Sequence, residues 1–160
     1  VKEEFGSNIK YILNGGKCNI GLESTIINLT SKPTILRLGG LDISKIEKVL
    51  KKKINININS KKISAPGQSL LHYSPGIPLK TNVKKSKKNE AFLLIKKRKI
   101  TMNNYFYLSK KNNLNEAAKN LYSCLREIKN LGYKSIVVEK ISNKGMGKVI
   151  NDRLNRASKY

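Results

Sequence analysis

GLESTIINLTSKPTILRLGG, residues 21–40 of the chain, combines a turn of small hydroxyl residues with two apolar strands. Ser24 and Thr25 offer short hydroxyls, and Arg37 adds a permanently charged, two-pronged donor that suits phosphate or carboxylate. The double glycine that follows leaves room beside the arginine. This pattern predicts an anion site, although two neighbouring strands with a turn and a surface arginine would give the same local sequence.

A second motif, SAPGQSLLHYSPGIP, follows at residues 64–78. Glu-Ser-Thr-Ile, Leu-Arg-x-Gly-Gly and Ala-Pro-Gly with His-Tyr-x-Pro, in this order, resemble the long-form threonylcarbamoyl-AMP synthases. These YrdC-like enzymes start the threonylcarbamoyladenosine modification of tRNA. Residues 1–6 and 13–18 read like the segment before the first motif, and residues 145–157 resemble the closing helix of the family's appended C-terminal domain. Separated matches in the right order are far more specific than a single motif.

The sequence also departs from the family pattern. Leu38 stands where the family usually has proline, and Gln68 with Leu70 or Leu71 replaces a methionine and a basic residue. The family's Lys-x-Arg pair, which grips the ATP phosphates, and its Ser-x-Asn segment are absent and would lie before Val1. The resemblance therefore implies a C-terminal fragment of a longer enzyme, and we expect this fragment to be inactive alone.

Together, the resemblance and the apolar pattern predict an α/β fold in three parts. We expect residues 1–60 to form the C-terminal part of a YrdC-like α/β catalytic domain and residues 61–80 to form a Pro/Gly-rich interdomain linker. Residues 81–160 are expected to form a small α/β domain with parallel, Rossmann-like strands. Strands that alternate with helices imply parallel pairing with right-handed crossovers.

Apolar spacing predicts the individual elements. Strands are expected at residues 9–13, 24–29, 34–36, 54–58, 91–95, 105–108 and 136–138, and helices at residues 43–50, 114–131 and 146–157. Asp42, or Ser44 with Glu47, would cap the first helix, and Asn113 with Glu116 would cap the second.

The chain is strongly basic, with 33 Lys and Arg against 10 Asp and Glu and a formal net charge of +23. Such a charge usually indicates a nucleic-acid surface. Here the lysine runs are scattered and are not interleaved with aromatic residues, and the richness in Lys, Asn and Ile is typical of AT-rich coding sequence. An alternative function therefore stays open, a non-catalytic basic RNA-binding or regulatory α/β module with tRNA or tRNA-modification proteins as partners.

Three other features indicate ordinary structure. Cys18 and Cys124 lack C-x-x-C spacing, so we expect reduced thiols in a cytoplasmic protein. No apolar run approaches the roughly 20 residues that span a bilayer, and no secretory leader opens the chain, so we expect no membrane association. Gly-Met-Gly-Lys at residues 145–148 lacks the spacing of a phosphate loop and indicates a helix start with glycines for packing.

The resemblance implies roles for four binding residues and for Glu23. Ser24 would contact the threonine substrate, and Arg37 would bind the nucleotide. His72 and Tyr73 would bind the nucleotide from the linker, which in the family resembles a flap over that ligand; the sequence alone would equally allow a turn without chemistry. Glu23 would orient the turn. No residue is assigned as catalytic or as a metal ligand.

The resemblance further implies a nucleotidyltransferase reaction. L-threonine is carboxylated by bicarbonate, and the carbamate attacks the α-phosphate of ATP to give threonylcarbamoyl-AMP and pyrophosphate. No covalent enzyme intermediate is needed, because the work is to hold anions close together while Mg²⁺ and basic groups offset their repulsion.

Overall fold

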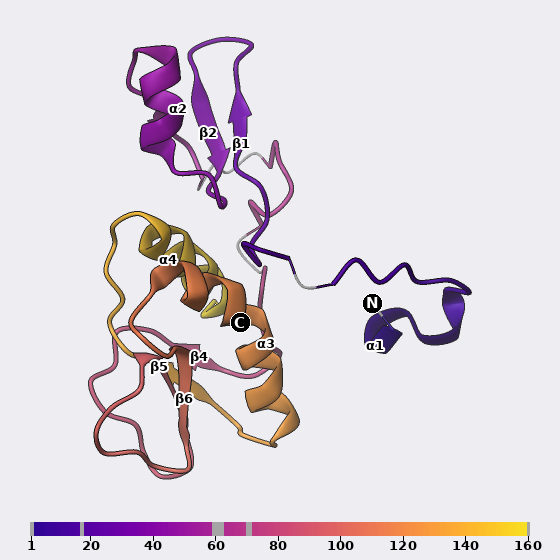
Figure 1. The fold of residues 1–160 in the computed structure, drawn as a ribbon, viewed down its shortest axis with the longest axis vertical. Helices are drawn as coiled ribbons and strands as arrows, with labels where there is room; N and C mark the ends of the chain where they lie inside the picture. The colour runs from indigo at the N-terminus through magenta and orange to yellow at the C-terminus, as the bar shows by residue number, and fades with distance from the viewer. Residues whose placement is uncertain (1, 17, 59–62, 70–71, 160) are drawn as a thin grey trace.

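The structure, a computed structural model, describes residues 2–16, 18–58, 63–69 and 72–159. Figure 1 shows a small sheet with one helix above a larger body of strands and helices. A segment that holds α1 (Lys2–Phe5) and the 3-10 helix η1 (Gly6–Asn8) runs away from both. We call residues 22–58 the first body and residues 79–159 the second body.

The strand predicted at residues 9–13 is wrong. This segment has no strand, and its side chains Tyr11 and Leu13 are 87% and 98% exposed. A strand needs a neighbour to satisfy its backbone groups. None of the described strands pairs with this segment.

The sheet of the first body has the order β1-β2-β3 and contains β1 (Ile26–Asn28), β2 (Thr34–Arg37) and β3 (Asn55–Ile56). β2 and β3 are parallel, as predicted, and α2 (Ile43–Leu50) connects them. β1 and β2 are antiparallel; the parallel prediction concerned strands separated by a helix and does not extend to this pair. Their connection, residues 29–33, is too short for the crossover that parallel strands require.

α2 begins at one of the two predicted caps. The Asp42 carboxylate accepts a hydrogen bond from the Ser44 amide at 2.9 Å, whereas the Glu47 carboxylate accepts from the Ile54 amide at 3.0 Å. The apolar face of α2 packs on a small core. This core contains Ile35, Leu38, Ile54 and, from the second body, Val149.

The sheet of the second body is entirely parallel and has the order β4-β7-β5-β6. Its strands are β4 (Leu79–Lys80), β5 (Ala91–Lys96), β6 (Tyr105–Ser109) and β7 (Ile136–Val138). α3 (Leu114–Asn130) and α4 (Met146–Ala157) pack against one face of this sheet. The predicted α/β fold with a parallel C-terminal sheet is confirmed, although β4 was not expected.

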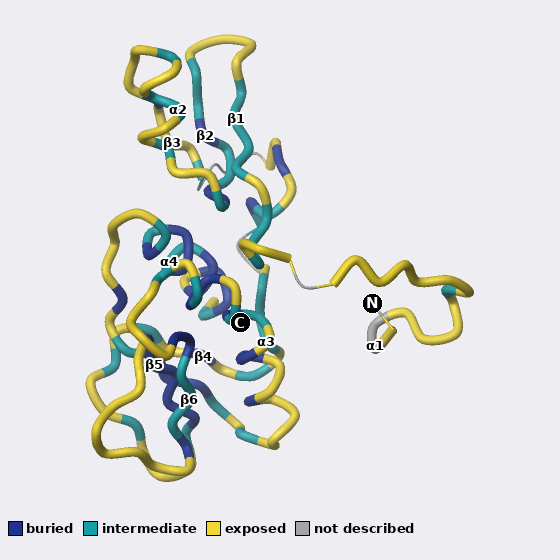
Figure 2. The backbone as a smooth tube through the Cα atoms, in the orientation of Figure 1, coloured by how far each residue is buried: buried dark blue, intermediate teal, exposed yellow. Residues whose placement is uncertain are grey.

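Burial is concentrated in the second body (Figure 2). Ala91, Leu93 and Ile95 of β5 join the core beneath α3 and α4. Phe92 and Leu94 of the same strand are fully buried on the opposite face. A strand that is buried on both faces reads as a continuous apolar run, as this one does.

The helices of the second body start as predicted. The Asn113 side chain accepts hydrogen bonds from the amides of Asn115 at 2.8 Å and Glu116 at 3.1 Å. In α4, a Cβ at Gly147 would lie 2.0 Å from the Ser142 carbonyl oxygen, so this glycine allows close packing. None of the helices in the described part of the chain has the length and apolar character needed to cross a membrane.

The two thiols lie in contrasting surroundings. Cys18 is exposed, Cys124 is buried in α3, and both are free. Burial raises the pKa of the Cys124 thiol to about 12, and the Glu127 charge adds to this effect. Cys124 therefore stays protonated and unreactive at neutral pH.

Candidate functional site

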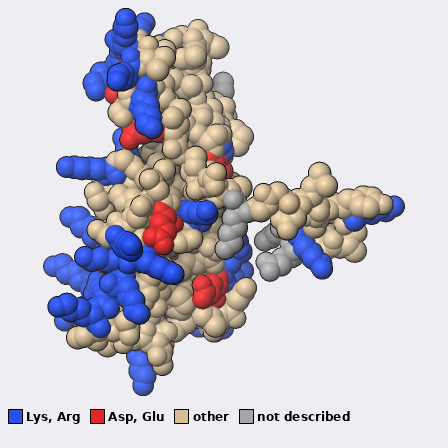
Figure 3. All heavy atoms as spheres, in the orientation of Figure 1, with Lys and Arg blue, Asp and Glu red and all other residues tan. Residues whose placement is uncertain are grey.

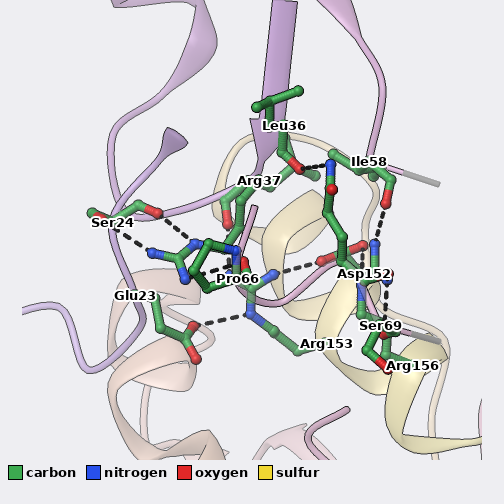
Figure 4. Close-up of polar contacts among 12 residues, drawn as sticks. Glu23, Ser24, Leu36, Arg37, Ile58, Pro66, Ser69, Asp152, Arg153 and Arg156 are labelled. Carbon is green, nitrogen blue, oxygen red and sulfur yellow. Dashed lines mark hydrogen bonds and ion pairs between the residues drawn. The ribbon is translucent and has the colours of Figure 1, made fainter. Parts of the chain in front are cut away.

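The candidate site lies where the first body, the linker and α4 meet (Figure 4). The Nε of Arg37 donates to the Ser24 carbonyl oxygen at 3.0 Å, and its Nη2 donates to the Ser24 Oγ at 3.1 Å. Its Nη1 donates to the Pro66 carbonyl oxygen of the linker at 3.4 Å. The structure therefore brings together two residues that the sequence singled out, and it places the linker against them.

Two glycines allow this close approach. A Cβ at Gly39 would lie 2.2 Å from both the Ser24 carbonyl carbon and the Thr25 nitrogen. Gly67 has a φ of +85°, and a Cβ there would lie 2.5 Å from the Tyr73 hydroxyl. Any side chain at either position would push the site apart.

Tyr73 packs between helices of the second body. Its ring stacks on Tyr122 of α3 with centroids 5.7 Å apart, and the guanidinium carbon of Arg153 lies 4.7 Å from the ring centroid. Tyr73 has a φ of +68°, which is costly for a residue other than glycine and persists only where the surroundings enforce it. His72 contacts the Tyr73 ring edge-on at 4.0 Å and is itself exposed.

The Tyr73 hydroxyl is buried, and it has no hydrogen-bond partner among the described residues. Burial raises the pKa of Tyr73; the Arg153 charge opposes this effect, and the Glu23 charge adds to it. The phenol is therefore neutral at physiological pH and retains a proton that it can donate.

Arg153, which is only 1% exposed, joins the second body to the first. Its Nε donates to the Glu23 carboxylate at 3.1 Å, and its Nη2 donates to the Leu38 carbonyl oxygen at 2.7 Å. Its Nη1 donates to Asp152 at 2.5 Å. The Tyr122 hydroxyl also lies 3.4 Å from the Glu23 carboxylate.

Glu23 is ionised in this position. Burial alone would raise the pKa of Glu23, but a hydrogen bond from its own backbone amide and the Arg153 guanidinium more than offset that effect. Arg37 adds a smaller contribution, and the pKa lies below its usual value. The charged carboxylate is held by Arg153 immediately before Ser24, a geometry that supports an orienting role for Glu23.

Gln68 and Arg156 attach the linker to both bodies. The buried Gln68 amide donates to the Leu36 carbonyl oxygen at 3.1 Å, and its Oε1 accepts from the Ala65 amide at 3.1 Å. Arg156 donates to the carbonyl oxygens of Gln68 at 2.9 Å and Ile58 at 2.5 Å. Gln68, which departs from the family pattern, therefore serves as a structural anchor of the linker.

Sequence reasoning missed the arginines of α4. Arg153 and Arg156 lie at positions that the helical spacing assigns to the apolar face, beside Ile150, Leu154 and Ala157. A charged residue within such a stripe is rarely buried unless it is paired. This interruption of the stripe was the available signal, although it does not reveal the partners.

A cavity of about 700 Å³ lies beyond Leu38, between α2 and the start of α4. None of Ser24, Arg37, His72 and Tyr73 lines it.

The fold and the site define an α/β protein in which two bodies share one polar, anion-suited junction. The chain belongs to the family described as threonylcarbamoyl-AMP synthase, C-terminal domain, which matches residues 41–159. A second family, described as telomere recombination, matches residues 1–39. The predicted resemblance is confirmed by these matches.

Named relatives agree with this assignment. The threonylcarbamoyl-AMP synthase of Pyrococcus abyssi is 33% identical, over 100% of this chain and 52% of the relative. The threonylcarbamoyl-AMP synthase of Schizosaccharomyces pombe is 28% identical, over 99% of this chain and 47% of the relative. The chain thus spans about half the length of the curated relatives it matches.

Two solved structures are similar in fold. The crystal structure of P. abyssi Sua5 complexed with L-threonine has a TM-score of 0.82 and 30% identity, and the match covers 99% of this chain and 52% of that chain. A P. abyssi Sua5 variant with an adjacent histidine and tyrosine both replaced by alanine has a TM-score of 0.73 and 28% identity. That match covers 91% of this chain and 47% of the variant.

Proposed function

We propose that this chain is part of a threonylcarbamoyl-AMP synthase that converts L-threonine, bicarbonate and ATP into threonylcarbamoyl-AMP and pyrophosphate. The reaction is a nucleotidyl transfer and would supply tRNA threonylcarbamoyladenosine formation. One observation carries the proposal: in a chain of this family, the Arg37 guanidinium is hydrogen-bonded to Ser24 next to the linker.

Arg37 suits an anionic ligand because its capacity is only partly used. A guanidinium has five N–H donors. Within the described part of the chain, three of them bind Ser24 and Pro66. The remaining two can bind a phosphate of the nucleotide, while the Ser24 hydroxyl turns toward threonine. The P. abyssi Sua5 complex with L-threonine supports an amino-acid ligand for this fold.

In this reaction the protein must position the two substrates and neutralise their negative charge. A carbamate oxygen must approach the α-phosphorus while the bond to pyrophosphate breaks, and both partners are negatively charged. Fixed donors that await this charge lower its energy without reorganising at the moment of reaction. Arg37 would neutralise phosphate charge, and the ionised Glu23 would keep the Ser24 turn in position through Arg153.

We propose that Mg²⁺ enters with ATP. Magnesium is usually held by substrate phosphates with one or two carboxylates. Within the described residues, no three His, Cys, Asp or Glu side chains gather as a metal site. The chemistry that Mg²⁺ would supply is neutralisation of the triphosphate.

We propose that residues 65–78 close over the nucleotide through His72 and Tyr73. The chain has a single histidine, so this is its one His-Tyr pair, and a variant of an adjacent His-Tyr pair has been made in the P. abyssi relative. The Tyr73 hydroxyl, which has no partner among the residues that the structure describes, offers a donor to the ligand. We also propose a division of the chain into three parts: part of the catalytic domain at residues 1–60, the interdomain linker at 61–80 and the C-terminal domain at 81–160. We further propose that the protein is cytoplasmic.

The RNA-binding alternative rests on charge. Lys and Arg gather on one flank of the second body in Figure 3. Exposed basic residues follow β5 at 97–99 and β6 at 110–111, where the ends of parallel strands share an edge. Strongly salt-dependent RNA binding by a chain that makes no adenylate would favour this alternative.

The reaction itself is the decisive test. The full-length protein that contains this chain is incubated with ATP, L-threonine, bicarbonate and Mg²⁺, and the adenylate and pyrophosphate are separated by chromatography. We expect an adenylate that requires both threonine and bicarbonate. Equal pyrophosphate release without threonine would contradict the proposed function.

A further inference from the structure

Arg153 of α4 contacts the chain beside each of the proposed substrate-binding elements. Its ion pair reaches Glu23, the residue before Ser24. Its hydrogen bond to the Leu38 carbonyl oxygen holds the residue after Arg37. The same guanidinium lies over the ring of Tyr73.

We propose that Arg153 is a positioning residue through which the second body sets the geometry of the substrate site. One planar group fixes the threonine-side turn, the end of β2 and the linker in a single arrangement. This inference rests on the proposed function for its kinetic consequence, but its structural part stands on the contacts alone.

The chemistry of arginine explains why this group can hold three elements together. A guanidinium donates in several fixed directions within one plane, and its face remains available for an aromatic ring. Arg153 uses its edges for Glu23, Leu38 and Asp152 and its face for Tyr73. Lysine keeps the charge but cannot reproduce these directions.

The backbone conformation of Tyr73 indicates how a change at Arg153 would reach the linker. Its positive φ must be enforced by its surroundings, which include the stacked Tyr122 ring of α3 and the Arg153 guanidinium of α4. A loss of the Arg153 contact should therefore release Tyr73 toward an ordinary backbone conformation. The same loss would free the Glu23 turn, so both sides of the site would change together.

Arg156 provides a matched control on the same helix. It is 4% exposed, is paired with Asp152 as Arg153 is, and donates to backbone carbonyl oxygens of Gln68, Ser69 and Ile58. Arg156→Lys therefore also perturbs a buried arginine of α4. These hydrogen bonds hold the linker and the end of the first body, not the turn and strand that carry Ser24 and Arg37.

The first experiment is hydrogen exchange on the 160-residue chain, comparing Arg153→Lys and Arg156→Lys with the unaltered protein. We expect Arg153→Lys to speed exchange in peptides that cover residues 22–26 and 37–40, by roughly tenfold or more if one charged hydrogen bond is lost. Arg156→Lys should act mainly on residues 63–69. Equal effects of the two variants on residues 22–26 would overturn the proposal.

The second experiment measures kcat and KM in the full-length protein. We expect Arg153→Lys to raise the KM for threonine by roughly tenfold, the same scale of one charged hydrogen bond, with a smaller change for Arg156→Lys. Unchanged KM values in Arg153→Lys would overturn the positioning role. If the unaltered full-length protein makes no adenylate, the proposed function fails, and the exchange experiment still decides whether Arg153 organises this junction.

Discussion

The two bodies of this molecule differ sharply in how they are held together. The second body buries a continuous core beneath α3 and α4 and a further cluster on the other face of its sheet. The first body has a small core, and one of its four buried members, Val149, comes from α4. Its surface also exposes apolar side chains such as Leu29, Val49 and Ile56.

This difference indicates that the first body is stabilised in part by contacts with the second body. These contacts are the apolar packing of Val149 and the ion pair of Arg153 with Glu23. The candidate site lies on these contacts, so the body with the weaker core carries Ser24 and Arg37, two of the proposed binding residues. Changes in the two bodies should therefore have different consequences for stability and for binding.

The largest expected effect is loss of reaction. We predict that the 160-residue chain alone makes no threonylcarbamoyl-AMP, because the phosphate-gripping motifs of the family are absent from it, while the full-length protein does make it. Adenylate chromatography under identical conditions checks this. Turnover by the isolated chain at the rate of the full-length protein would show that the two bodies suffice.

Truncation should cost more at a buried position of the second body than at an exposed position of the first body. Leu121→Ala removes a fully buried side chain of the second body and should cost about 2–5 kcal/mol of unfolding free energy. Val49→Ala, at a position 81% exposed in the first body, should change stability by less than about 0.5 kcal/mol. Denaturant unfolding of both variants measures this contrast, and similar losses of unfolding free energy would contradict the prediction.

Arg37→Lys should affect nucleotide binding and threonine binding differently in the full-length protein. Lysine keeps the charge but loses the planar fork, so nucleotide binding should weaken by roughly 1.5–3 kcal/mol. Threonine affinity measured without ATP should change less. Calorimetric titration with each ligand checks this, and an untouched ATP affinity would show that Arg37 does not bind the nucleotide.

The linker pair should affect turnover more than stability. His72 is exposed, and the Tyr73 hydroxyl has no partner among the described residues, so His72→Ala and Tyr73→Phe should leave the melting temperature nearly unchanged. Both should lower turnover in the full-length protein, and ATP should slow proteolysis within residues 72–78. Cleavage that is indifferent to ATP, with normal turnover in both variants, would mark the linker as a spacer.

The smallest expected effect concerns pH. The pKa of Glu23 is lowered in the folded chain, so its stabilising contribution is present above its ordinary pKa and is lost as pH falls through the lowered value. Glu23→Gln should therefore flatten part of the acid limb of the stability curve. Unfolding measured from about pH 7 down to pH 3 tests this. An acid limb identical in both proteins would show that the ionic contact contributes nothing to stability.

Sequence predicted best what local chemistry controls. The caps at Asp42 and Asn113 use partners two or three residues away; Asn113 was assigned correctly, and Asp42 was one of the two alternatives given for its helix. The strand predicted at residues 9–13 was wrong, because strand pairing depends on neighbours that a local pattern does not specify. Apolar alternation alone does not supply a partner strand.

The candidate site divides in the same way. Ser24 and Arg37 were found through their motifs, and the structure places them in contact. Arg153 was missed because its partners lie 130 residues away at Glu23 and 115 residues away at Leu38. A charge on an apolar stripe signals that a partner exists, but only the fold identifies it.

The unequal burial of the two cysteines makes the chain convenient for optical labelling. Cys124 is shielded within α3 and holds its proton at neutral pH, whereas Cys18 is exposed. A maleimide dye should therefore attach at Cys18 alone, three positions before Gly21, without any engineered mutation. A fluorophore at that point would report, in real time, on movements of the segment that leads into the Ser24 turn.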